Sequence, residues 1–179
     1  IQVSRPVLIL GRIVSRLDDI GMNASPDPTA PQRLRADWLR VLAQAPAEQL
    51  TAQAEPHLAG HSFEALREPE EGLVMLRARI GNTGDRFNLG EATLARCVLR
   101  HTGPDGRVWL GVGHVLGRDT AHARCVAQLD ALLQRSDLHA QLWAAVVAPL
   151  AAEQEEARRQ QRAETEATRV RFFTLQPEV

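Results

Sequence analysis

The chain has 179 residues, 44% of them hydrophobic, which is enough for one domain with a substantial core. Its 21 Lys and Arg residues almost balance its 22 Asp and Glu residues, so the net charge of −1 gives no electrostatic reason to expect a nucleic acid or an anionic membrane as partner. Aromatic residues make up only 4% and there is no Tyr, which argues against a surface that stacks nucleic-acid bases.

The first 32 residues differ in composition from the rest of the chain. The first Met is Met22, and the one continuous apolar run before it, residues 7–10, is too short for a signal-peptide core or a membrane span. We therefore expect the native start at Met22, a non-native or disordered extension over residues 1–32, and a single domain over residues 33–179. An amphipathic N-terminal helix is the alternative. Cys97 and Cys125 are too few for a disulfide framework, so a cytoplasmic location is expected.

Two helices are predicted at the start of the domain. The first, over residues 33–44, places four apolar side chains on one face: Leu34, Trp38, Val41 and Leu42. Pro46 interrupts this pattern and is well tolerated in the first turn of a helix, so a second helix is expected over residues 47–58. The two would form a helical hairpin.

About four β-strands are expected next. Alternation from Ser62 onwards predicts a hairpin whose two strands are joined by a Pro-Glu-Glu-Gly turn at residues 69–72. Two more strands are expected over residues 87–101 and 107–116, with a strong turn signal over residues 102–106. The short connections predict an antiparallel meander and not βαβ units.

The segment GNTGDRFNLGEATLA, residues 81–95, is rich in glycine but does not match a nucleotide-binding motif. The dinucleotide and P-loop fingerprints lie between a strand and a helix, whereas these glycines connect two strands. The residues 81–84 are predicted to form a tight turn, and Gly90 a β-bulge. Arg86 is a candidate anion ligand, and Glu91 a candidate general base or partner contact.

Helical periodicity returns after Gly117. Asp119 is predicted to cap a helix, and a second helix is expected from Ser136 to just before Pro149. Residues 151–169 are polar on all sides, which is typical of a helix that bridges solvent or is supported by a partner. An apolar tail follows, with Phe172 and Phe173. The predicted class is α+β.

The best candidates for metal or acid–base chemistry are His114, Asp119 and His122. A strand-end His, a turn Asp and a first-turn His are residue types that bind zinc or iron, and they would make the protein a metal-dependent hydrolase. No pair has the i, i+4 spacing of zinc-binding helices, so the favoured interpretation is that Asp119 caps the helix and His122 is partly buried. Cys97 is a candidate nucleophile, but it lies mid-strand on an apolar face, where a free Cys usually packs.

Several segments together resemble the PhnG family, a subunit of the bacterial carbon–phosphorus lyase core complex. They cover residues 33–175, and the most specific are NLGEATLARC, the LGRDTAHA that follows it, and the terminal RVRFFT. The resemblance implies a non-catalytic or accessory subunit that assembles with the H, I and J subunits, most directly with the I subunit.

The same resemblance implies a role in an ATP-dependent transfer. With the H, I and L subunits, PhnG is needed to transfer ribose triphosphate from ATP to methylphosphonate with release of adenine, before a radical step by the J subunit. The complex uses ATP, but no cofactor bound by this chain is expected. Residues expected to shape an interface or to complete a partner's site are Arg86, Glu91, Arg118, Asp119, His122, Phe172 and Phe173.

Overall fold

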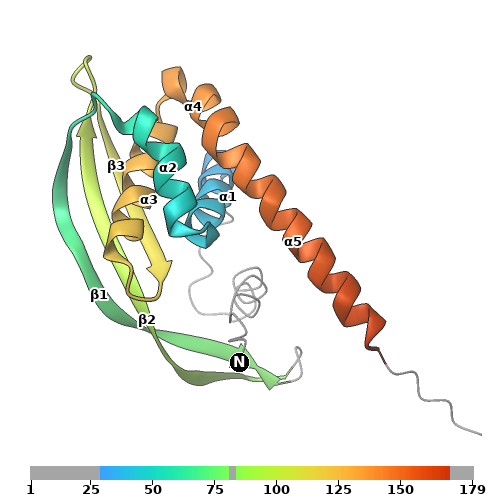
Figure 1. The fold of residues 1–179 in the computed structure, drawn as a ribbon. Helices are drawn as coiled ribbons and strands as arrows, with labels where there is room; N and C mark the ends of the chain where they lie inside the picture. The colour runs from blue at the N-terminus through green and yellow to red at the C-terminus, as the bar shows by residue number, and fades with distance from the viewer. Residues whose placement is uncertain (1–28, 81–83, 170–179) are drawn as a thin grey trace, which may run out of the picture.

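The computed structural model describes residues 29–80 and 84–169. It has one layer of helices packed on one face of an antiparallel sheet (Figure 1). The predicted α+β class is confirmed. No helix within the described ranges is long and apolar enough to cross a membrane. Met22 and the other residues of 1–28 lie outside the described residues, as do Phe172 and Phe173.

The N-terminal helical hairpin is confirmed. Helix α1 spans Ala30–Gln44, so it begins three residues earlier than predicted, with Thr29 and Gln32 forming a capping box. Helix α2 spans Ala47–Leu58 and follows Pro46, its N-cap. The core contains Trp38, Val41 and Leu42 of α1. Leu34 was predicted on the same face but is exposed, as are most residues of the first two turns of α1, none of which is buried.

The meander has three strands, in the order β1-β2-β3, and the prediction of four is wrong. The expected turn at residues 69–72 does not exist, because strand β1 continues through it from Phe63 to Arg79. The pairing with β2 is irregular at Ala65/Arg67 and at Arg67/Glu70. Pro69 lies in the second irregularity, where its missing N–H breaks no regular ladder bond, so the strand continues. Strand β2 spans Arg86–Thr102 and strand β3 spans Val108–Leu116.

The glycine-rich segment connects β1 to β2, as predicted. The antiparallel ladder ends with Arg79 opposite Arg86, and residues 81–83 of the connection lie outside the described residues. The bulge is also confirmed: Leu76 pairs with Gly90 and Arg77 with Asn88, so one extra residue of β2 has no partner. Gly90 has φ +152°, a backbone conformation that other residues rarely adopt. The strand-to-strand context removes the reason to expect a phosphate loop.

The core lies between the sheet and helix α3, which spans Thr120–Leu133. Glycines on β3 allow a close approach: a Cβ atom at Gly111 or Gly113 would lie 1.9 Å from a carbonyl oxygen of α3. Alanines of α3 face these glycines, so backbone packs nearly against backbone. Cys97 and Leu99 of β2 complete this layer and are fully buried.

The C-terminal helices run on through Pro149, and the predicted helix end before it is wrong. Helix α4 (Ser136–Leu142) leads into a π-helical turn (Trp143–Val147) and then into helix α5 (Ala148–Ala167). Proline lacks an N–H and is tolerated in the first turn of a helix, and Pro149 is the second residue of α5. Helix α4, the π-helical turn and helix α5 follow one another without a break, so the chain continues through Pro149 as one long helical element.

Helix α5 is polar on nearly all sides, as predicted, and Leu150 is its single buried residue. Its first turns are held by hydrogen bonds from Gln154 Nε2 to the Val41 carbonyl and from Arg158 Nη2 to Gln44 Oε1, each 2.8 Å long. Residues 159–169 are all exposed. Figure 1 shows this end of α5 extending beyond helices α1, α2 and α3.

Candidate functional site

An open groove of about 430 Å³ lies between helix α2 and the start of helix α3. Two of the predicted site residues, Asp119 and His122, line it together with Glu48, Thr51 and Glu55. The groove therefore combines several carboxylates with one imidazole. The hydrogen bonds of Asp119 and His122 fix the positions of these two side chains in the groove.

Asp119 is the N-cap of helix α3, as predicted. Its Oδ1 accepts a hydrogen bond of 2.8 Å from the backbone N–H of His122. The Asp119 carbonyl also accepts the N–H of Ala123 at 3.1 Å. Such a cap satisfies amide groups that have no partner inside the helix, and typically contributes about 1 kcal/mol. This hydrogen bond gives the carboxylate a structural role in starting the helix.

His122 is buried in the first turn of α3, where only 6% of it is exposed. Its Nε2 lies 3.0 Å from the carbonyl oxygen of Leu42, at the end of helix α1. A carbonyl oxygen only accepts, so Nε2 carries the proton and donates. The imidazole thus links α3 to α1. The predicted burial of His122 is confirmed.

His114 lies away from this groove, so the predicted metal trio is not assembled. On β3, Gly113 and Val115 face helix α3, and the alternation of a strand directs His114 to the opposite face, across from Arg96. Partial burial, with the charges of Arg96 and Arg67, lowers the pKa of His114. In the described part of the chain, no three His, Cys, Asp or Glu side chains are grouped so that they would hold a metal ion.

The other described candidates do not line the groove, and they lie at separate positions. Arg118 follows β3, is 79% exposed and lies 3.8 Å from Glu71 as a weak ion pair. Glu91 is exposed on β2 opposite Met75, and Arg86 pairs in register with Arg79 near the hairpin tip. The structure therefore brings Asp119 and His122 together but places Arg86 and Glu91 on the hairpin, apart from the groove.

Neither cysteine has the environment of a nucleophile. Cys97 is fully buried and its Sγ lies 3.6 Å from the Arg67 carbonyl, and burial raises its pKa. Burial raises the pKa of Cys125 to about 11. A thiol must ionise before it attacks, so a raised pKa argues against nucleophilic chemistry at either site. Both side chains are buried and pack as small hydrophobic groups.

We expect slow thiol labelling in the folded protein. A pKa that is two units above that of an exposed thiol lowers the thiolate fraction about a hundredfold at pH 8. The reaction of Cys125 with a disulfide reagent should therefore be about a hundredfold slower in the native protein than in the unfolded chain. Cys97→Ser and Cys125→Ser variants assign the two rates. Rapid labelling of native Cys97 would restore it as a candidate nucleophile.

A buried histidine–arginine cluster lies at the far end of helix α3. The Arg135 guanidinium lies 3.0 Å from His101 Nε2 and 5.3 Å from the ring centre of Trp109, and it donates to Asp137 at 2.5 and 3.1 Å. Arginine only donates, so His101 Nε2 accepts and Nδ1 donates to the Ser62 carbonyl. The cluster joins β2, β3 and the α3–α4 junction. It was not predicted, because His101 and Arg135 are 34 residues apart in the chain and no local pattern joins them.

Acidification is expected to weaken the fold through His61, whose ring lies 5.2 Å from that of His101. Burial, and then electrostatic interactions with His101 and Arg135, lower the pKa of His61 below its usual 6.5. A histidine with a lower pKa in the folded state contributes stability above pH 6.5, and that stability is lost as the pH falls through the folded-state pKa. Urea unfolding of His61→Gln at pH 7.5 and 5 should show a smaller loss on acidification than the parent. An unchanged or larger loss would contradict this assignment.

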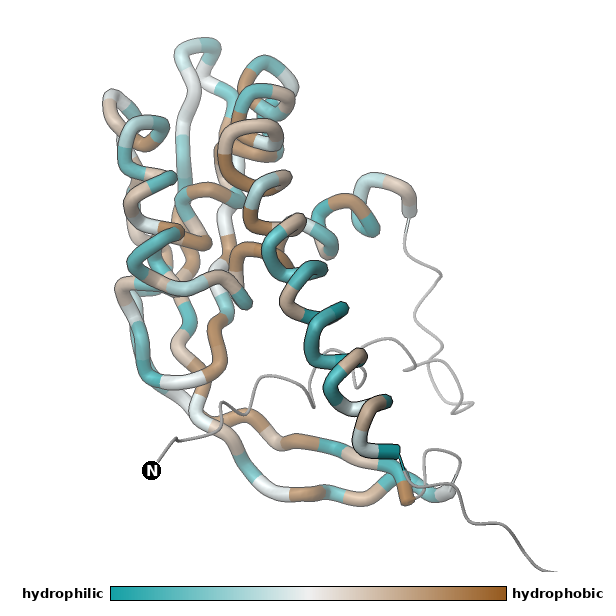
Figure 2. The backbone as a smooth tube through the Cα atoms, turned by 45° about the vertical axis from the view of Figure 1, so that its right-hand side comes forward, coloured by the Kyte–Doolittle hydropathy of each residue, from teal (hydrophilic) through white to brown (hydrophobic). Residues whose placement is uncertain are grey.

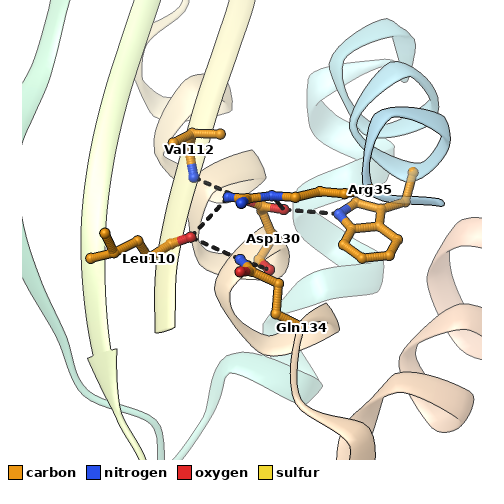
Figure 3. A network of polar contacts seen from close by, with 6 residues as sticks. Arg35, Leu110, Val112, Asp130 and Gln134 are labelled. Atoms are coloured by element: carbon orange, nitrogen blue, oxygen red, sulfur yellow. Dashed lines mark hydrogen bonds and ion pairs between the residues drawn. The ribbon is translucent and has the colours of Figure 1, made fainter. Parts of the chain in front are cut away.

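A buried carboxylate, Asp130, connects three elements and was not predicted (Figure 3). Its Oδ1 accepts from Arg35 Nε at 3.1 Å and from Trp38 Nε1 at 2.9 Å, and its Oδ2 accepts from Arg35 Nη2 at 2.7 Å and from the Val112 N–H at 2.9 Å. Helix α1, strand β3 and helix α3 are thereby joined at one fully buried side chain. A signal existed in the sequence, because Asp130 falls on the apolar face of α3 beside Val126 and Leu133.

Comparison with known proteins agrees with the resemblance drawn from the sequence. The family described as "Phosphonate metabolism protein PhnG" matches residues 33–176. A protein of Rhizobium meliloti (strain 1021) named "Alpha-D-ribose 1-methylphosphonate 5-triphosphate synthase subunit PhnG" is 40% identical over 141 residues, which cover 79% of this chain and 87% of that protein. The chain therefore belongs to the PhnG family of phosphonate metabolism proteins.

Proposed function

We propose that the chain is an accessory, non-catalytic subunit of a carbon–phosphorus lyase system. With H, I and L subunits it would support the transfer of ribose triphosphate from ATP to methylphosphonate with release of adenine. The observation that carries this proposal is the 40% identity to a protein named as a subunit of a ribose methylphosphonate triphosphate synthase. ATP is then a substrate of the complex, and this chain itself holds no cofactor.

The roles of the candidate residues support an accessory subunit. Asp119 is committed to a helix cap and His122 to the Leu42 carbonyl, so both have a structural function in the folded chain. Arg86 and Glu91 lie on the hairpin, apart from that groove. We propose that five residues shape contacts with the H, I and J subunits, most directly with the I subunit, in the cytoplasm. They are Arg86, Glu91, Arg118, Asp119 and His122.

Reconstitution tests this proposal. Purified H, I and L subunits, ATP and methylphosphonate should release adenine when this chain is added, and should release little when it is omitted. The chain alone, at the same concentration, should release none. Adenine formed by the isolated chain would contradict the accessory role, and a full rate without the chain would contradict its membership in the complex.

A further inference from the structure

The distal half of the β1–β2 hairpin extends beyond the body of the protein. Strand β3 pairs with β2 only from Leu94 onwards, so residues 73–79 and 86–93 form a two-stranded ribbon, here called the hairpin arm. None of its residues is buried. Both views show it extending beyond helices α1, α2 and α3, toward the same end of the molecule as the C-terminal end of α5 (Figures 1 and 2). A two-stranded ribbon is marginally stable in water, so this length of arm needs another source of stability.

The hairpin arm exposes large apolar side chains to solvent. Leu73 is 68% exposed, Leu89 54%, Met75 47% and Phe87 41%, and Ile80 beside the arm is 66% exposed. Strand alternation places Leu73 and Met75 on one face of the arm and Phe87, which pairs with Ala78, on the other. Single exposed apolar residues are common, but several of them on both faces of one ribbon indicate an interaction surface. Figure 2 shows apolar positions recurring along both strands of the arm. We therefore expect another polypeptide to cover the arm.

The outer edge of β1 is protected only in its proximal half. Strand β1 is an edge strand, and its proximal half contains Pro69, acidic side chains and two pairing irregularities, all features that prevent pairing with another strand. The distal sequence GLVMLRAR, residues 72–79, has no proline or acidic residue, and the bulge near it places its extra residue on β2. The open edge of β2 in the arm is thus interrupted by the bulge, whereas that of β1 is regular.

We propose that residues 72–79 of β1 accept an extended, acidic strand from another subunit, which would pair with this edge by main-chain hydrogen bonds. The identity of that subunit as a member of the phosphonate-processing complex rests on the proposed function. Such strand addition draws affinity from the backbone and specificity from alternate side chains. The only charged side chains of the segment are Arg77 and Arg79. Carboxylates on the incoming strand complement them.

Charge also argues against a second copy of this chain on the same edge. Pairing of residues 72–79 with themselves would gather four arginines on one short ladder, with no carboxylate from either strand. Within residues 29–80 and 84–169, the side chain of Arg77 forms no hydrogen bond or ion pair, while that of Arg79 donates to the Gly84 carbonyl at 3.3 Å. Arg77 is therefore available to an acidic partner.

Amide hydrogen exchange tests the proposal directly. In the free chain, those amides of residues 72–79 that donate to β2 should exchange slowly, and the alternate amides, which point to the open edge, should exchange fast. In the complex of this chain with the H, I and J subunits, both sets should be slow. Fast exchange of the edge amides in a fully assembled complex would overturn the proposal, and if the free chain aggregates, the complex alone gives this answer.

Charge reversal provides a second test. Arg77→Glu should weaken association with the other subunits roughly tenfold or more, because it sets a carboxylate against the acidic strand. Arg40→Glu on helix α1, which is similarly exposed, is the matched control and should have little effect. Unchanged affinity of Arg77→Glu would count against the proposal. A homodimer of the free chain with protected edge amides would assign the edge to a second copy and overturn it.

The two ideas fail in different ways. If the parent chain does not bind the H, I and J subunits at all, the proposed function is wrong. If the parent chain binds and the edge amides stay fast, the complex is real and only the assignment of the edge is wrong.

Discussion

Replacing Gly113 by alanine is expected to destabilise the protein by about 3 kcal/mol or more, at the upper end of the range for overpacking. The added Cβ would lie 1.9 Å from the carbonyl oxygen of Ala123 and 2.8 Å from its carbonyl carbon. These are backbone atoms of helix α3, so no side-chain rotation relieves the clash, and the helix must move away from the sheet. Gly111→Ala meets the Ala127 carbonyl oxygen at the same distance and should behave alike.

The matched control is Gly72→Ala on strand β1. Its Cβ would meet only the flexible side chain of Arg96, at 3.7 Å, so the free energy of unfolding should change by no more than about 0.5 kcal/mol. Urea unfolding at pH 7.5 measures all three variants. A loss of stability below about 1 kcal/mol for Gly113→Ala would contradict this close packing of α3 on β3, because the backbone could then accept a Cβ atom at residue 113.

Replacing Asp130 by asparagine should cost about 3–5 kcal/mol, the range for breaking a buried ion pair. Each carboxylate oxygen accepts two N–H groups, so the amide nitrogen of asparagine faces two donors in either orientation. Arg35 would lose its charged partner, and it also donates to the Leu110 carbonyl at 2.9 Å. Helix α1 should loosen first, because Arg35 and Trp38 both belong to it.

Asp37→Asn on the same helix is the control for that substitution. Asp37 is 59% exposed and lies 3.8 Å from Arg40, so its loss should change the free energy of unfolding by no more than about 0.5 kcal/mol. Hydrogen exchange of the α1 amides reports the local loosening. Equal stability of Asp130→Asn and the parent would mean that Asp130 is not the junction of the three elements.

The features that sequence predicted well are those set by local chemistry. Asp119 caps a helix because a side-chain oxygen next to a helical pattern has few alternatives, and Gly90 lies at a bulge because it interrupts a regular strand. The helical hairpin was predicted from Pro46, which ends the first helical pattern and is the N-cap of α2. Each prediction needed only a few neighbouring residues.

The features that sequence predicted badly depend on tertiary contacts or on backbone irregularity. Pro69 looked like part of a turn, but irregular pairing with β2 carries the strand through it. Pro149 looked like a helix end, but the π-helical turn before it lets the helix continue. The position of Asp130 on the apolar face of α3 was a local signal of a buried carboxylate, but its partners lie on two other elements, and Arg35 is 95 residues away, so sequence spacing did not identify them.

The candidate residues divide in the same way. The trio of His114, Asp119 and His122 was suggested by residue type alone, and the alternation of β3 places His114 on the far face of the sheet. The burial of His122 followed from its place in the first turn of an amphipathic helix. Strand parity, once the register is known, decides which of these side chains can meet.

The rate of adenine release per assembled complex tests most directly whether this chain acts through assembly. Arg86→Ala, Glu91→Ala, Arg118→Ala and His122→Ala should lower the amount of complex formed, while the rate per assembled complex stays within about twofold of the parent. Loss of a group that takes part in proton transfer or charge stabilisation would lower that rate about a hundredfold or more. Such a loss in a fully assembled complex would place one of these residues in the active site and contradict the accessory role.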